Sequence, residues 1–291
     1  KNKKMLECNA VLISDTSLYD EGIPTITYGL RGLLYTEIEI TGPNRDLHSG
    51  SMGGAFANPI IELANLIAKL KDKKGKITIP NFYQDVIPLT RKERANFDRL
   101  KFNDKKFAKE YGVKELKGED GFSTLERLWC RPTLDCNGIK GGFLGEGAKT
   151  VIPSKASAKI SMRLVPNQKP GLIAKDFKQY IQSLIPNTVK AEVKVYHSAL
   201  PVVVELDSPV IKAAEKALAR SFKRETVFTR EGGSIPIVVD FMRYLNVPAL
   251  LMGFGLDSDN IHSPDEHWDL KNFEMGLVSS IFFLEEYGKN K

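Results

Sequence analysis

The chain has 291 residues, 42% of them hydrophobic and 27% charged, which is typical of a globular protein with one large or two modest domains. Its formal net charge of +6 is spread along the sequence, and the basic stretches 69–76 and 91–117 are not interleaved with stacking aromatic residues and glycines, so we expect no nucleic-acid partner. The sequence has no apolar run near the roughly 20 residues of a membrane span and no recognisable signal peptide, so we expect no membrane association.

The first predicted elements are a buried strand at 10–14 and a strand at 33–42 in which apolar and polar residues alternate. Helical spacing of apolar residues predicts a helix at 59–70, and the polar stretch 81–131 is interpreted as a helical insertion that includes a helix over 91–112. After it we predict strands near 133–140, 155–165 and 189–196, with a helix at 170–185 between the last two. Without the insertion, this order is β-α-β-β-α-β, the order of a ferredoxin-like α+β domain.

Different elements flank this block. We predict a helix at 208–222 with Ser208 as its cap and Pro209 as its first residue, an apolar strand at 248–255, and a closing helix at 270–287. The sequence therefore predicts an α/β domain, formed by residues 1–32 and 204–291, that is interrupted by an inserted α+β ferredoxin-like domain at 33–203 with the helical insertion 81–131.

The first residues raise a question about completeness. The chain has no Met at position 1, yet it enters the apolar run "AVLIS" within ten residues. We expect the α/β domain to be incomplete, with its N-terminal part absent. The three cysteines, Cys8, Cys130 and Cys136, form no CxxC pair and are odd in number, which indicates no disulfide framework and favours a cytoplasmic location.

Two residues stand where an open α/β sheet binds ligands, which is beyond the carboxyl ends of its strands. Asp15 follows the first buried strand, and His262 lies on the loop after the strand at 248–255. A carboxylate and an imidazole that converge there could ligate Zn²⁺ or a similar divalent ion. Taken alone, a turn role for Asp15 and a solvated role for His262 are the simpler explanations.

Three further segments have a structural and a functional interpretation. His48, in the glycine-rich "RDLHSGSMGG", is either a turn histidine or a group delivered to a site by domain closure or by another subunit. Arg163, with Thr150 in the preceding segment, is either a surface arginine or a carboxylate clamp. The "REGGSIP" segment at 230–236 is either a turn with a helix cap or an anion-binding helix start.

Five segments occur in a fixed order along the chain. They are "LISDTSLYDEGIPTITYGLRG", "RDLHSGSMGG", "GEGAKTVIPSKASAKISMRLVPNQ", "TREGGSIPI" and "IHSPDE". Together they resemble the dizinc metallopeptidases of the M20 family, specifically the carnosinase-like dipeptidase branch. The resemblance extends over nearly the whole chain and is least distinctive at 81–131.

The resemblance implies a role for each matching residue. It implies that the 1–32 and 204–291 segments form the catalytic domain and that 33–203 forms a lid and dimerisation domain, so we expect a homodimer. Asp15 and His262 match metal ligands, and His48 matches a lid histidine that reaches the partner subunit's active site and helps stabilise the tetrahedral intermediate. The substrate-binding positions are matched by Thr150 and Arg163, for the C-terminal carboxylate, and by Glu231, Gly232 and Ser234.

The implied cofactor is a pair of divalent metal ions, with Zn²⁺ first and Mn²⁺ or Co²⁺ as alternatives, which would activate a water for attack on the peptide carbonyl. The family's other ligands and its general base precede the ligand aspartate, and no position before Asp15 matches them. The acidic pair Glu285 and Glu286 stands in the wrong place. We therefore interpret this chain as the C-terminal portion of a longer enzyme and expect it to be inactive by itself.

The sequence thus predicts a metal-dependent dipeptidase acting on dipeptides or short peptides. The alternative within the family is an N-acyl-amino-acid deacylase. The alternative outside catalysis is a dimerisation or binding module without enzymatic activity.

Overall fold

The computed structural model describes residues 3–289 and divides into two compact units. Unit 1 contains the chain up to Arg31, the segment Thr90–Leu100, and the chain from Pro201 onward. Unit 2 contains Gly32–Leu89 and Lys101–Leu200. The chain thus crosses between the units four times, and each unit has its own hydrophobic core.

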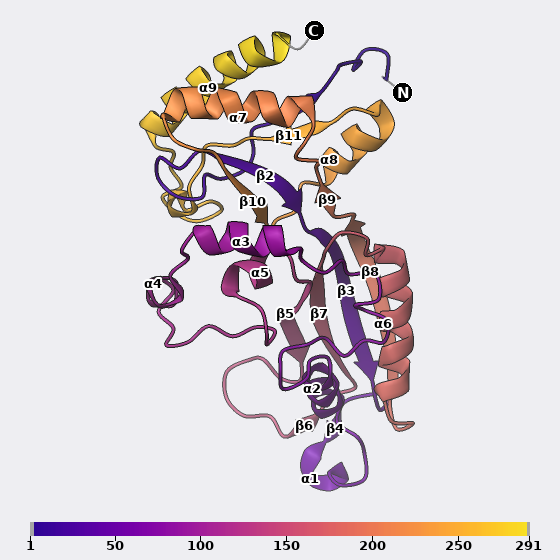
Figure 1. Ribbon diagram of the computed structural model, residues 1–291. Coiled ribbons are helices and arrows are strands. Elements are labelled where there is room, and N and C mark those ends of the chain that lie inside the picture. Colours follow the sequence, from indigo (N-terminus) through magenta and orange to yellow (C-terminus); the bar gives the residue numbers. More distant parts are fainter. Residues whose placement is uncertain (1–2, 290–291) are drawn as a thin grey trace. The chain divides into compact units, whose positions relative to one another are not determined.

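A mixed sheet forms the centre of unit 1 (Figure 1). Strand β1 (Val11–Ile13) pairs in parallel with β11 (Ala249–Leu251), and β2 (Thr25–Leu30) pairs in parallel with β10 (Val227–Glu231). The two parallel pairs meet at an antiparallel contact between β11 and β2, and the short β9 (Val202–Val203) also pairs with β2. All six residues of β2 are buried, which makes this strand the centre of the sheet.

Helices α7 (Pro209–Phe222) and α9 (Leu270–Gly288) pack together in unit 1. The buried face of α9 combines small and polar residues, Asn272, Gly276 and Ser279, with the large Phe283, and the Ser279 hydroxyl lies 2.7 Å from the hydroxyl of Ser221 on α7. Large apolar side chains on α9 are instead exposed: Leu270, Leu277, Ile281 and Leu284. Polar contacts between the two helices therefore add to the apolar packing of Phe283 in the core of unit 1.

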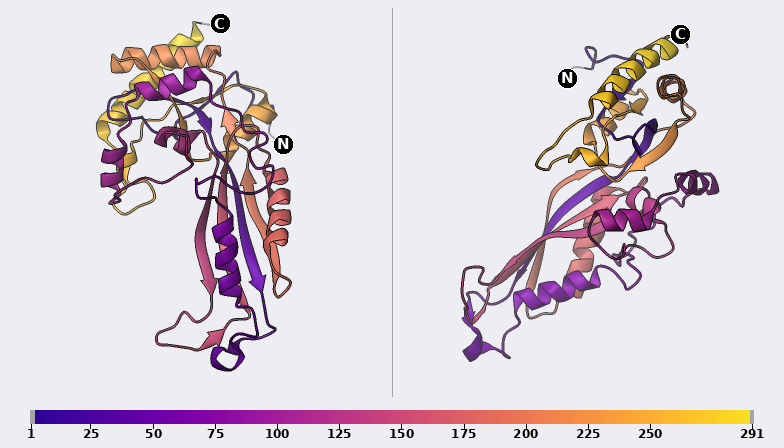
Figure 2. Two further views of the ribbon diagram at one scale, coloured as in Figure 1. Left: turned by 60° about the horizontal axis from the view of Figure 1, so that its bottom comes forward. Right: turned by 90° about the vertical axis from the view of Figure 1, so that its left-hand side faces the viewer.

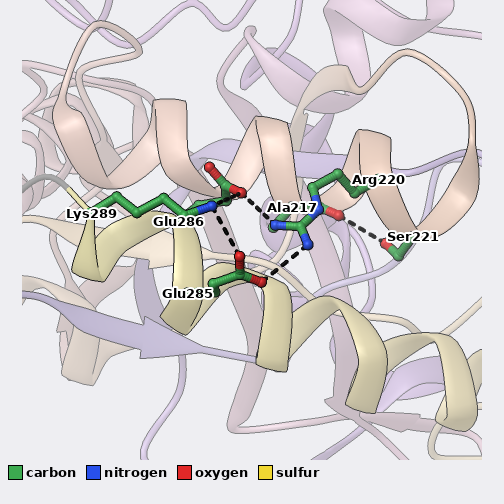
Figure 3. A network of polar contacts seen from close by, with 6 residues as sticks. All are labelled: Ala217, Arg220, Ser221, Glu285, Glu286 and Lys289. Atoms are coloured by element: carbon green, nitrogen blue, oxygen red, sulfur yellow. Dashed lines mark hydrogen bonds and ion pairs between the residues drawn. The ribbon is translucent and has the colours of Figure 1, made fainter.

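Those polar contacts form one network near the C-terminal end of α9 (Figure 3). Arg220 on α7 binds the carboxylates of Glu285 and Glu286, and Lys289 binds the same two carboxylates at 2.9 and 3.0 Å. The Arg220 guanidinium also lies 4.1 Å from the centre of the Phe282 ring. The two glutamates therefore join the end of α9 to α7.

An antiparallel four-stranded sheet forms unit 2, with the order β5-β7-β3-β8. Its strands are β5 (Thr133–Gly141), β7 (Lys155–Leu164), β3 (Gly32–Thr41) and β8 (Lys190–Ala199). Burial alternates residue by residue along β3 and β7, so one sheet face is covered. Helices α2 (Pro59–Lys69) and α6 (Pro170–Leu184) cover it and run along the strands (Figure 2). The predicted β-α-β-β-α-β order is confirmed.

The predicted insertion is helical, but it contains three short helices: α3 (Arg91–Arg99), α4 (Asp104–Glu110) and α5 (Thr124–Trp129). The single helix expected over 91–112 is wrong, because Lys101 takes a left-handed backbone conformation (φ 48°) and Asn103 caps a new helix by accepting from the amide of Lys106. Moreover, α3 belongs to unit 1, whereas we expected all of 33–203 to belong to the inserted domain.

Further differences concern unit 1. Strands β2 and β10 were not predicted, and the expected strand at 248–255 is a strand over Ala249–Leu251, followed by an isolated bridge between Gly255 and Ser17. Ser208 does precede α7, but its buried hydroxyl makes no cap bond and has no hydrogen-bond partner among the described residues. Within residues 3–289, no helix combines the length and the apolar character needed to cross a membrane.

Candidate functional site

Asp15 and His262 follow two neighbouring strands that run in the same direction. Asp15 lies two residues past β1, and His262 lies on the loop after β11, with Ile13 paired to Leu251 at the ends of the two strands. Gly253 is required between them, because a Cβ there would lie 1.8 Å from the carbonyl oxygen of Thr16. The carboxyl ends of β1 and β11 therefore lie at the same edge of the sheet.

Asp15 and His262 do not complete a metal centre with the other described residues. Both are exposed, and His262 has a left-handed backbone conformation (φ 63°). Across residues 3–289, no three His, Cys, Asp or Glu side chains are grouped so that they could hold a metal ion. Because a zinc site takes three or four protein ligands, the described residues by themselves do not fit a complete site.

Glu231, at the end of β10, is the most buried carboxylate of the candidate site. Its Oε1 accepts from the Ser17 amide at 3.0 Å and from the Thr27 hydroxyl at 3.1 Å. Burial raises the pKa of Glu231, and the negative charges of Asp257 and Asp15 raise it further, against the opposing effect of the two hydrogen bonds. Glu231, Asp15 and Asp257 thus form an acidic group, and the field of this group favours a cation.

The loop after Glu231 is held by Arg31. The Arg31 amide donates to the carbonyl oxygens of Glu231 and Gly233, and its Nε donates to the carbonyl of Gly232 at 3.1 Å. The Ser234 hydroxyl donates back to the Arg31 carbonyl. The helix that follows, α8 (Pro236–Asp240), has only five residues, and the turn is explained by these contacts without a bound anion.

Two predicted site residues of unit 2 lie in direct contact. Strand β4 (Leu47–His48) pairs with β6 (Val151–Ile152), and α1 (Ser49–Met52) follows β4. His48 Nε2 lies 3.2 Å from the Thr150 hydroxyl, 102 residues further along the chain. These three elements stand together at one end of unit 2 (Figures 1 and 2).

Arg163 lies near the other end of β7. It pairs with Leu33 on β3 and with Thr133 on β5. The β4–β6 pair lies next to the opposite end of β7, which begins at Lys155 directly after Ser154. Eight residues of strand correspond to about 26 Å. Within one chain, Arg163 is therefore far from His48 and Thr150.

Some residues of the site were missed by sequence reasoning. Asp257, Ser17 and Thr27 surround Glu231, and Arg31 holds its loop. Only the acidic "DSD" segment at 257–259 offered a signal, because the other three residues act through contacts with parts of the chain more than 200 residues away. Asp269, which also follows this loop, has a structural role, because it caps α9 by accepting from the Lys271 amide at 2.7 Å.

Comparisons with known proteins identify relatives along the whole chain. A Cys-Gly metallodipeptidase of Saccharomyces cerevisiae is 36% identical over 287 residues, which are 97% of this chain and 59% of that protein. A Beta-Ala-His dipeptidase of Homo sapiens is 29% identical over 279 residues, 94% of this chain and 55% of that protein. The crystal structure of an M20 family metallo-carboxypeptidase from Sulfolobus solfataricus has a TM-score of 0.88 at 30% identity, covering 98% of this chain and 65% of that one.

The chain spans 59% of the length of the yeast relative. Residues 28–189, more than half of the chain, match the peptidase dimerisation domain of the M20 family. This confirms the family expected from the five ordered segments. The chain therefore belongs to the M20 peptidase family.

Proposed function

We propose that this polypeptide carries active-site residues of a metal-dependent dipeptidase that hydrolyses unblocked dipeptides. The observation that carries the proposal is the acidic group of Glu231, Asp15 and Asp257, in a chain 36% identical to a Cys-Gly metallodipeptidase. An unblocked dipeptide has a cationic amino end, and an ammonium ion next to these carboxylates offsets the cost of ionising Glu231 in a buried place. An N-acylated amino acid lacks this positive charge.

Arg163 and Thr150 are the proposed partners of the substrate's carboxylate. A guanidinium binds a carboxylate through two parallel hydrogen bonds, and a hydroxyl can add a third. An extended dipeptide is only about 7 Å long, so a single substrate cannot touch both Arg163 and the His48–Thr150 pair of one chain. We therefore propose a homodimer in which the His48–Thr150 pair of one subunit completes the site of the other.

The proposed cofactor is a divalent metal, Zn²⁺ first, with Asp15 and His262 among its ligands. When bound, such a metal would polarise the peptide carbonyl and activate water. Asp15 and His262 are exposed side chains that make no hydrogen bond or ion pair within residues 3–289, so both are available to a metal ion. The free cysteines Cys8, Cys130 and Cys136 favour a reducing compartment, in line with a cytoplasmic location.

The test is metal content and hydrolysis with Cys-Gly and Beta-Ala-His as substrates, measured on this chain and, side by side, on the full-length protein as wild type, Asp15→Ala and His262→Ala. We expect each variant to lose both bound metal and activity, with Asp269→Ala as a control carboxylate that caps α9. Cleavage of N-acetyl amino acids in place of free dipeptides would support the deacylase alternative. Dimerisation without stoichiometric metal or hydrolysis would support the non-catalytic module.

Arg163→Lys tests the carboxylate clamp separately. Lysine keeps the charge but loses the paired donors, so we expect KM for a dipeptide to rise by about tenfold or more. A dipeptide amide, which has no terminal carboxylate, should respond little to the substitution. Equal losses for both substrates would refute the assignment.

A further inference from the structure

We infer that the turn after β4 fixes His48 as a hydrogen-bond donor through Nε2, with Gly50 and the Ser51 amide as the positioning groups. The Ser51 backbone N–H points at His48 Nδ1 at 3.3 Å. A backbone amide can only donate, so Nδ1 has to accept. In a neutral imidazole with Nδ1 as acceptor, the proton is on Nε2.

The Nε2–H group faces the Thr150 hydroxyl at 3.2 Å. A hydroxyl has one hydrogen to donate and two lone pairs that accept. When the Thr150 oxygen accepts from Nε2–H, its own hydrogen stays free for another acceptor. His48 thereby turns Thr150 into a donor, which is the form that a substrate carboxylate requires.

Gly50 provides the space in which the imidazole lies. A Cβ at position 50 would be 2.9 Å from His48 Cε1, closer than real contacts allow, and 3.2 Å from Nδ1, which is a tight contact, so the imidazole would have to move. Its backbone conformation is one that alanine adopts freely, because Gly50 is not among the glycines with positive φ. Glycine at position 50 is therefore needed because it leaves space for the imidazole of His48, and not because the backbone conformation requires it.

The turn itself is anchored independently of the ring. The Ser49 amide donates to the Thr150 carbonyl at 3.0 Å, and the Ser154 amide donates to Asp46 Oδ1 at 2.8 Å. Leu47 pairs with the buried Ile152 across β4 and β6. A change that displaces only the imidazole should consequently leave this end of unit 2 folded.

The first experiment reads the tautomer of the 291-residue chain directly. The chain has four histidines, so labelling histidine with ¹⁵N gives a simple spectrum, and His48→Gln identifies the signal of His48. At about pH 8.5, two units above the ordinary histidine pKa, long-range ¹H–¹⁵N correlations distinguish the two nitrogens of a neutral ring. We expect His48 to carry its proton on Nε2.

His267 is an internal reference with the opposite expectation. Its Nδ1 lies 3.0 Å from the Asp265 carbonyl oxygen, which can only accept, so its proton should be on Nδ1. Finding the Nδ1–H tautomer at His48 would overturn the inference. Thr150→Val should leave the His48 tautomer unchanged, because the Ser51 amide and not Thr150 imposes it; a change there would also overturn it.

Gly50→Ala tests the positioning role. Gly171→Ala is a matched control, because Gly171 also occupies the second position of a helix in unit 2 and has open space around its Cα. Alanine favours a helix over glycine, so neither variant should lower the thermal stability. Only Gly50→Ala should shift the His48 signal toward a mixture of tautomers, with His267 unaffected; an unchanged His48 signal would contradict the proposed role of Gly50.

The catalytic consequence rests on the proposed dipeptidase function. Because His48 acts here through Thr150, which binds the substrate's carboxylate, His48→Ala and Gly50→Ala should each raise KM for a free dipeptide by about tenfold with little change in kcat, and a dipeptide amide should respond little. The double variant should raise KM no further than His48→Ala alone. If the full-length wild type hydrolyses nothing, the proposed function fails while the spectra of this chain still decide the tautomer, so the two failures are distinguishable.

Discussion

Replacing Glu93 by glutamine removes the charge that ties helix α3 to strand β10. Glu93 binds the guanidinium of Arg230, accepts from the Tyr28 hydroxyl at 3.3 Å, and closes a capping box with Thr90 at the start of α3. The Arg230 guanidinium also lies over the Tyr28 ring, 4.9 Å from its centre. Loss of the carboxylate should therefore weaken the attachment of α3 to β10 and β2 within unit 1.

The magnitude follows from how far the ion pair is shielded from water. The side chains of Arg230 and Glu93 are only 13% and 21% exposed. Breaking a fully buried pair costs roughly 3–5 kcal/mol and an exposed pair contributes roughly 0–1 kcal/mol, so we expect a loss of about 2 kcal/mol for Glu93→Gln. That corresponds to about 30-fold faster opening of the local structure.

Hydrogen exchange is the appropriate assay, because two units need not unfold in a single step. Peptides from α3 and β10 should exchange about 30-fold faster in Glu93→Gln, while the core of unit 2 stays unchanged. Asn96, whose side chain donates to the Phe228 carbonyl at 3.0 Å, links the same two elements and should limit the effect to this region. Glu110→Gln, at an exposed position of α4, is the control.

The pH dependence gives a second check. Burial opposes the ionisation of Glu93, but hydrogen bonds from Thr90, the charge of Arg230 and the Tyr28 hydroxyl outweigh it and lower its pKa. A lowered pKa stabilises the fold above the ordinary value of 4.5 and loses this effect as the pH falls through the folded value. The difference from wild type should hence be largest near pH 7 and shrink toward pH 3. A difference below about 0.5 kcal/mol at pH 7, or one independent of pH, would refute this reasoning.

Three further predictions concern other buried charges and hydroxyls. Arg131 binds Glu119 through two hydrogen bonds of 2.7 and 2.8 Å and lies 4.1 Å from the centre of the Phe122 ring, so Arg131→Lys should destabilise unit 2 by about 2 kcal/mol in urea unfolding; an unchanged midpoint would contradict this. Burial raises the pKa of Tyr83 to about 12, so the difference between the ultraviolet titrations of wild type and Tyr83→Phe should show one tyrosine ionising near pH 12. Wild type should also lose stability relative to the variant between pH 10 and 12. Ionisation of this tyrosine near pH 10 would disprove the prediction. Because burial raises the pKa of Glu231, its ionised form destabilises the fold above that pKa, and Glu231→Gln should slow exchange of β10 amides relative to wild type at pH 7 but not at pH 4. An equal effect at both pH values would count against it.

How much could be predicted differs between the two units. Alternation along 33–42 predicted β3 within one residue of its observed bounds, because one face of that sheet is covered and the other is not. Strand β2 was missed because all six of its residues are buried, so "TITYGL" has no alternation to detect. Similarly, helical periodicity in 91–112 indicated that the segment has an apolar face. It did not indicate that the buried Phe97 belongs to unit 1 and α4 to unit 2.

The sequence by itself determined the family, the order of the segments and the identity of the candidate residues, because these depend on residue types at fixed spacing. Only the tertiary structure decided which candidates meet. It brought His48 against Thr150 and surrounded Glu231 with Ser17, Thr27 and two further carboxylates. It also placed Arg163 at one end of β7, far from His48 and Thr150 near the other end. The physical reason is that burial, like-charge repulsion and hydrogen-bond geometry all depend on distances between parts of the chain that are remote in sequence.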